Sequence, residues 1–109
     1  MQWTSDKSGT TVSFADLTMT AKDWVNFGNF LLTQKKSNTC LGKFFNDGID
    51  KSLNTGKKNG SRYGYQSWVF NVYSQPSMVL QGHAGQFMVL DEKTNTVLLT
   101  ISLNENYKV

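Results

Sequence analysis

The sequence predicts an α+β domain in which two helices precede a three-stranded antiparallel sheet. Apolar side chains recur at helical spacing up to about residue 53, and beyond residue 62 the spacing changes to two, as in strands. Helices in succession followed by strands in succession are typical of an antiparallel α+β arrangement. The length of 109 residues favours a single domain spanning residues 1–109.

The first helix is expected over residues 20–34. Thr20 is a candidate N-cap, and Asp23 three residues later completes a pattern like a capping box. Lys35 and Lys36 follow at the C-terminal end, where cations interact favourably with the helix dipole. The apolar side chains at helical spacing are Trp24, Phe27 and Leu31.

The second helix is expected from Thr39 to about Leu53. Gly42 and Gly48 weaken it by roughly 1 kcal/mol each relative to alanine. Residues 54–61 form a loop rich in glycine, asparagine and lysine. The apolar side chains of this helix are Leu41, Phe44, Phe45, Ile49 and Leu53.

Three strands follow the loop. The first is expected over residues 63–73, the second over residues 78–90 with a bulge or kink at Gly82 to Gly85, and the last over residues 96–103. Pro76 interrupts the pattern between the first two, because proline cannot donate to a strand ladder. Residues 91–95 are a loop of hairpin length.

The composition argues against several classes of function. The net charge is +3 and Arg62 is the only arginine, so a nucleic-acid partner is not expected and the lysines predict a solvated surface. A single cysteine, Cys40, and a single histidine, His83, exclude an internal disulfide and predict no metal site. Only 17% of the residues are charged, which predicts apolar surface that meets other protein.

The N-terminus lacks the basic start and apolar core of a signal peptide, and no apolar run approaches the ~18 residues of a membrane span. We therefore expect a soluble chain without a membrane span. Its compartment stays open.

The glycine-bracketed histidine in residues 80–91 is the most informative stretch. Taken by itself, Gly82-His83-Ala84-Gly85 indicates only a bend or a close approach of backbone or ligand. His83 is then a surface or hydrogen-bonded structural histidine. No Gly-x-Ser-x-Gly motif is present to provide a nucleophile.

Four segments in order resemble the β-lactamase-related serine hydrolases, which have the penicillin-binding-protein fold. They are residues 14–28, residues 63–68 (Tyr-Gly-Tyr-Gln-Ser-Trp), residues 81–87 (Gln-Gly-His-Ala-Gly-Gln-Phe), and the Asp91 loop with the last apolar strand. The similarity covers roughly residues 10–104 and is greatest to the branch of class C β-lactamases, esterases and 6-aminohexanoate-dimer hydrolases. It implies that the sheet is part of the α/β sandwich of that family.

The resemblance implies acyl-enzyme hydrolysis of an amide, ester or β-lactam bond without a cofactor. A main-chain amide on the strand of a Lys-Thr-Gly-like triplet would form half of the oxyanion hole. The triplet is either residues 80–82, which makes the His83 amide the donor, or residues 83–85, which makes it the Gln86 amide. The implied catalytic region is Gly82 and His83, and the implied substrate-binding residues are Gln81, Gly85 and Gln86.

The family's nucleophile is missing from this sequence. No serine is followed three residues later by lysine, and neither Tyr-x-Asn nor Lys-Thr-Gly occurs. The family's final helix, expected after Leu103, is missing as well. We therefore expect a C-terminal fragment that is inactive alone and that associates with the complementary N-terminal part, or with itself through an exposed sheet edge. A small-molecule substrate is expected only in the intact enzyme, whose full-length relatives are often periplasmic or secreted.

Two alternatives stay open. The chain is a binding or interaction module derived from the same fold, or an unrelated α+β domain whose motifs agree by chance. In the module, a ligand groove is expected from aromatic side chains that could equally form core: Tyr65, Trp68, Phe70 and Tyr73.

Overall fold

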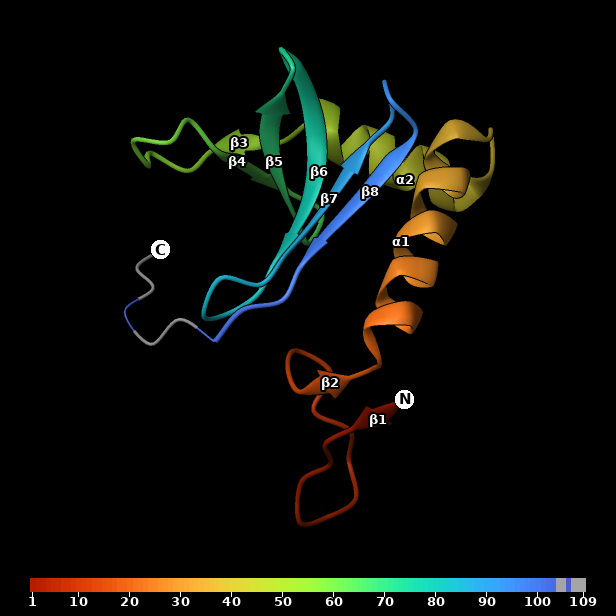
Figure 1. Ribbon diagram of the computed structural model, residues 1–109, viewed down its shortest axis with the longest axis vertical. Helices are drawn as coiled ribbons and strands as arrows, with labels where there is room; N and C mark the ends of the chain where they lie inside the picture. The colour runs from red at the N-terminus through yellow and green to blue at the C-terminus, as the bar shows by residue number, and fades with distance from the viewer. Residues whose placement is uncertain (104–105, 107–109) are drawn as a thin grey trace.

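The computed structural model describes residues 1–103 and 106, which form two helices and two antiparallel sheets (Figure 1). β1 and β2 make a small two-stranded sheet, and the other six strands form one sheet in the order β3-β4-β5-β6-β7-β8. The elements are β1 (Gln2–Trp3), β2 (Leu17–Thr18), α1 (Ala21–Lys36), α2 (Cys40–Asp50), β3 (Leu53–Asn54), β4 (Arg62–Gly64), β5 (Ser67–Val72), β6 (Gln75–Gln81), β7 (Phe87–Asp91) and β8 (Thr96–Thr100).

The prediction of two helices with a three-stranded sheet is therefore wrong, because the strands are shorter and more numerous. Two-residue turns at Tyr65–Gln66 and Tyr73–Ser74 reverse the chain with φ of 46° and 65°, and of 49° and 64°. Positive φ at both central residues is the geometry of tight hairpin turns, which usually contain glycine or asparagine. None of these four residues is glycine or asparagine, so the sequence contains no turn signal that would divide the alternating pattern into separate strands.

Pro76 lies within β6 and does not interrupt the sheet. It is opposite Asn71 of β5, whereas the pairing of β6 with β7 begins only at Met78. A proline is tolerated in a strand where its missing N–H faces an unpaired side.

Both helices begin after a threonine N-cap: Thr20 is the predicted cap of the first helix, and Thr39 is the residue predicted to begin the second. The Thr20 hydroxyl accepts from the Asp23 amide at 3.1 Å, which confirms the predicted start of α1, and the helix continues two residues past the expected end. The Thr39 hydroxyl accepts from the Gly42 amide at 3.0 Å at the start of α2. That helix ends at Asp50, and Leu53 begins β3.

Both helices pack on one face of the six-stranded sheet, α1 over β7 and β8 and α2 over β4 to β6 (Figure 1). The core lies between these two layers. Val69, Met78 and Leu90 are direct cross-strand partners, and Met88 lies two residues before Leu90, so these side chains lie on the same face of the sheet. The core consists of Leu31, Leu32, Ile49, Val69, Met78, Met88 and Leu90.

The two glycines that weaken α2 are needed for close packing. A Cβ on Gly42 would collide with the Gln34 carbonyl oxygen of α1, and a Cβ on Gly48 would lie 2.8 Å from Cβ of Tyr65. The glycines therefore lower the helix propensity of α2 but allow its backbone to pack closely against α1 and the β4–β5 turn.

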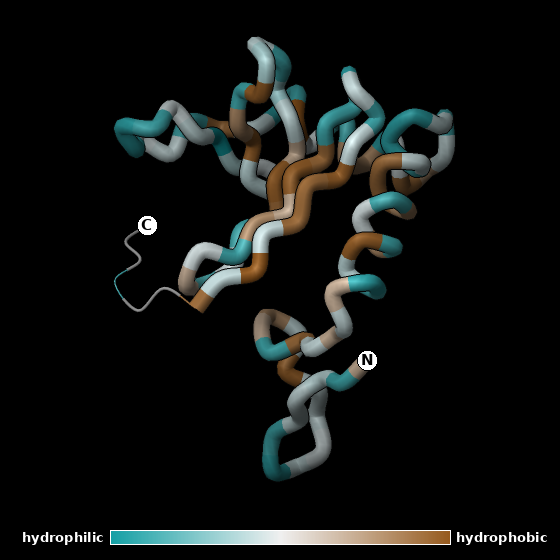
Figure 2. The backbone as a smooth tube through the Cα atoms, viewed as in Figure 1, coloured by the Kyte–Doolittle hydropathy of each residue, from teal (hydrophilic) through white to brown (hydrophobic). Residues whose placement is uncertain are grey.

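The opposite face of the sheet carries an apolar row that no helix covers among the described residues. Direct cross-strand pairing aligns its members over five strands, and the middle of the sheet is apolar along its strands (Figure 2). We call this row the open face; its members are Tyr63, Trp68, Val79, Val89 and Leu98.

The molecule exposes more surface than its size requires. Its accessible surface is 7719 Å², whereas a compact monomer of this mass exposes about 6,100 Å². Residues 1–20 contribute to the difference, since they extend away from the body (Figure 1) and hold Phe14 at 90% exposure. The resemblance implies a final helix after Leu103. The structure describes only Asn106 of the residues that would form it.

Candidate functional site

The residues singled out from the sequence lie in a hairpin between β6 and β7, and not in a bulge within one long strand. Gln81 at the end of β6 pairs with Phe87 at the start of β7, and the Gly82 amide donates to the Gln86 carbonyl at 2.8 Å. The predicted continuous strand over residues 78–90 is thus wrong. The chain reverses because the loop contains two left-handed residues in succession, Ala84 and Gly85, with φ of 62° and 87°.

The hairpin brings all five candidate site residues together within one loop and its flanks. His83 and Gln86 are exposed, and Gln81 and Gly85 are half-buried. Within the described part of the chain, the amides of His83 and Gln86 donate no hydrogen bond, whereas the Gly82 amide is occupied. Both amides expected as oxyanion-hole donors are therefore without a hydrogen-bond acceptor among the described residues.

Within the residues that the structure describes, no hydrogen bond joins His83 to a nucleophilic side chain. The serine hydroxyls that bond do so locally: Ser52 to the Ile49 carbonyl at 2.7 Å, and Ser77 to the Gln75 carbonyl at 3.4 Å. Among residues 1–103 and 106, no serine hydroxyl is hydrogen-bonded to an imidazole or to a lysine amine. His83 has no orienting partner in the same residues, so these side chains hold no serine–base pair.

The four aromatic side chains expected to line a groove do not share one surface. Tyr65 and Tyr73 occupy turns, and the Tyr65 hydroxyl donates to Asp47 Oδ2 of α2 at 2.7 Å. Trp68 and Phe70 lie side by side along β5 with ring centroids 6.4 Å apart. The ring of Trp68 also meets that of Tyr63 edge-on at 5.1 Å, with Lys57 Nζ 4.7 Å from its centroid.

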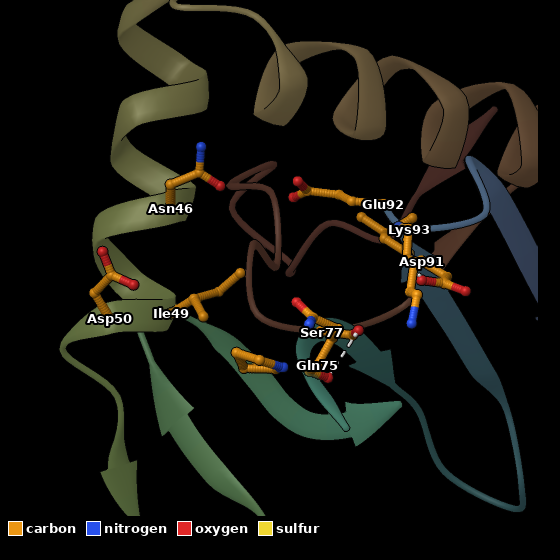
Figure 3. A pocket seen from close by; sticks show the side chains of 10 residues that line it. Asn46, Ile49, Asp50, Gln75, Ser77, Asp91, Glu92 and Lys93 are labelled. Carbon is orange, nitrogen blue, oxygen red and sulfur yellow. Dashed lines mark hydrogen bonds between the residues drawn. The ribbon is translucent and has the colours of Figure 1, made fainter. Parts of the chain in front are cut away.

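A polar depression of about 250 Å³ lies at the other end of the same strands (Figure 3). Side chains of α2 face it from one side, and β6, β7 and the following turn face it from the other. It is lined by Asn46, Ile49, Asp50, Gln75, Pro76, Ser77, Leu90, Asp91, Glu92 and Lys93. Sequence patterns did not reveal it, because three separate segments meet there only after folding.

Beside this depression lies a buried lysine. Lys35 of α1 is 3% exposed, although we expected a solvated side chain at a helix end. Its Nζ lies 2.9 Å from Glu92 Oε1 and donates to Asn46 Oδ1 at 2.9 Å. Asp91 is also buried, and it accepts from the Lys93 amide at 3.1 Å and from the Thr94 hydroxyl at 2.7 Å. The buried charges thus join the two helices to the β7–β8 turn and close that turn.

The described residues contain no group of three or more histidine, cysteine or acidic side chains arranged to hold a metal ion. Within the same residues, neither helix combines the length and apolar character needed to cross a membrane. Comparison with models of protein families, with curated proteins and with solved structures found no match.

Proposed function

We propose that this chain is one part of a serine hydrolase and supplies the main-chain wall of its active site. The observation that carries the proposal is the β6–β7 hairpin, where the amides of His83 and Gln86 lie three residues apart and donate no hydrogen bond within the described chain. Such donors, aimed at a developing oxyanion, contribute ~3–4 kcal/mol of transition-state stabilisation.

The adjacency of the motif segments supports this assignment. Trp68 lies on β5, Gln81 on β6 and Phe87 on β7, and the three strands are neighbours in the sheet. Segments that resemble one enzyme family in order along the chain therefore form one continuous surface.

The nucleophile is expected to come from the complementary part of the hydrolase, outside the described residues. The described residues pair no serine with a base, and the exposed Tyr63 and Leu98 of the open face leave room for a partner. The partner supplies the serine and lysine, and this chain supplies backbone donors and the substrate-facing side chains Gln81 and Gln86.

Hydrolysis of a chromogenic short-chain ester and of nitrocefin tests the proposal. The purified chain is assayed alone and then mixed with the N-terminal half of a β-lactamase-related hydrolase that carries Ser-x-x-Lys. We expect hydrolysis only in the mixture. Hydrolysis by the chain alone would contradict the proposal, because a nucleophile would then lie within it.

The variant Gly82→Ala tests whether the hairpin faces the substrate. The added Cβ would lie 3.3 Å from Gln86 Cβ and 3.9 Å from the Gln86 carbonyl oxygen, so a shift of a few tenths of an ångström in this exposed hairpin accommodates it and the variant is expected to fold. In the mixture we expect its kcat/KM to fall at least about tenfold, because the methyl group crowds the substrate carbonyl. Gln75→Ala, at the exposed far end of β6, is the control and should retain activity.

A non-catalytic binding module is the second candidate function. The observation in its favour is the aromatic cluster of Tyr63, Trp68 and Phe70 on a face that no helix of the described residues covers, with Lys57 over the indole. Aromatic faces bearing a nearby cation bind planar or apolar ligands by stacking. Absence of hydrolysis alone and in the mixture, together with saturable quenching of Trp68 fluorescence by a ligand, would favour this function.

A further inference from the structure

The last strand of the sheet presents an unprotected edge. β8 pairs with β7 only, and no other described strand meets its outer side. Residues 96–103 contain neither a charge nor a proline. Natural sheets protect exposed edges with lysines, prolines or bulges, because an unprotected edge pairs with another chain.

The sequence of β8 is nearly symmetrical about its middle residue. It reads Thr-Val-Leu-Leu-Thr from residue 96 to residue 100. Leu98 is therefore flanked by the apolar Val97 and Leu99, and a threonine stands at each end. An antiparallel copy centred on Leu98 would pair Thr96 with Thr100, Val97 with Leu99, and Leu98 with itself. Threonine pairs and apolar pairs are favourable cross-strand neighbours.

We propose that β8 pairs antiparallel with β8 of a second copy of this chain, in the register centred on Leu98. The register preserves the faces of the sheet: Val97 and Leu99 pack toward the helices, and Leu98, 59% exposed, lies on the open face. The two sheets then continue into one another and both unprotected edges disappear. This dimer does not rest on the hydrolase proposal, because it requires only the chain itself.

The outer flank of α1 extends the same interface. α1 is the helix that packs over β7 and β8, and its Leu32 and Lys35 are buried toward the core and α2. Phe27 and Phe30 lie on the other flank of this helix at 38% and 49% exposure, as the 100° rotation per residue requires. A two-fold axis at Leu98 places both helix layers on one side of the joined sheet, so the two flanks approach each other.

Sedimentation equilibrium of the full chain and of Leu98→Lys tests the dimer. Two lysines placed directly opposite each other repel, so we expect the dimer dissociation constant to rise at least about tenfold. Leu53→Lys is the matched control, since it places the same charge on an exposed leucine at the other end of the sheet, in β3. Circular dichroism should show that both variants are folded.

Disulfide cross-linking tests the register in a Cys40→Ser background, because Cys40 is exposed. Leu98→Cys lies opposite its own copy, at a separation that suits a disulfide, and should form a covalent dimer on oxidation. Thr96→Cys lies opposite Thr100 of the copy and should not.

Three results would overturn this proposal. They are a monomer at all concentrations up to about 100 μM; a dimer lost in Leu53→Lys but kept in Leu98→Lys; and equal cross-linking at residues 96 and 98. Association only on addition of a complementary hydrolase half would equally count against a second copy as the occupant of the edge.

Discussion

At the scale of single residues, the most informative side chain is Lys35. A lysine near the end of an exposed helix is ordinarily solvated, yet here the ammonium group is enclosed by Asn46 of α2 and Glu92 of the β7–β8 turn. Asn46 Nδ2 also donates to the Lys35 carbonyl at 2.8 Å. One residue thus ties three segments, and its charge depends on Glu92 for compensation.

This dependence predicts an asymmetry between two substitutions. Glu92→Gln leaves the buried ammonium without its counter-charge and should lower the free energy of unfolding by about 2 kcal/mol. Lys35→Met removes the buried charge and leaves Glu92, whose side chain is 43% exposed, in water, so the change should stay within about 1 kcal/mol. Urea unfolding measures both, with Lys36→Met as the control. A larger loss for Lys35→Met than for Glu92→Gln would contradict the argument.

At the scale of elements, α2 is joined to the β4–β5 turn by a polar contact at the surface. The Tyr65 hydroxyl and then Lys51 hold the pKa of Asp47 below its ordinary value of 3.8. The Tyr65 ring stacks on Phe44 at 5.0 Å and approaches Gly48. The turn is therefore held to the helix by both packing and a charged hydrogen bond.

The direction of the Asp47 shift predicts a pH dependence. A carboxyl group whose pKa is lower in the folded state stabilises the fold at pH values above its unfolded pKa. This contribution is lost as the pH falls through the folded pKa, which for Asp47 lies below 3.8. Tyr65→Phe should therefore be less stable than the natural chain at neutral pH, and the difference should narrow below 3.8. Urea unfolding midpoints of both proteins, at neutral pH and below pH 3.8, measure this difference in stability. Tyr73→Phe, in an exposed turn, is the control. A gap of equal size at both pH values would show that ring packing alone is involved.

At the scale of the whole molecule, residues 1–20 stand apart from the packed layers. Their hydrogen bonds are mostly internal: Trp3 Nε1 donates to the Ala15 carbonyl at 2.9 Å, and the amides of Ser8 and Thr10 donate to the Asp6 carboxylate. Apart from the Thr20 cap of α1, this segment adds little to the main core, whose buried members all lie between Leu31 and Leu90 in the sequence.

Removal of residues 1–19 should therefore leave the melting temperature of the remainder nearly unchanged. Thermal unfolding followed by circular dichroism compares residues 1–109 with residues 20–109, which retain the Thr20 cap. A fall of more than about 5 °C, which corresponds to roughly 1 kcal/mol for a domain of this size, would show that the segment packs on the core in solution.

The local features of this protein follow from sequence alone. The Thr20 cap of α1, the two helices and the turn after Asp91 depend on spacing and on side chains a few residues apart. The grouping of Gln81, Gly82, His83, Gly85 and Gln86 also follows, because they are neighbours in the chain.

Only tertiary structure decided the number of strands, the burial of Lys35 and the polar depression beside α2. The turns at Tyr65–Gln66 and Tyr73–Ser74 carry no glycine or asparagine, so it is the pairing of β4, β5 and β6 that holds them in the left-handed region. The partners of Lys35 lie 11 and 57 residues away along the chain. Local pattern cannot foresee such contacts, because their energy arises only when distant segments exclude water together.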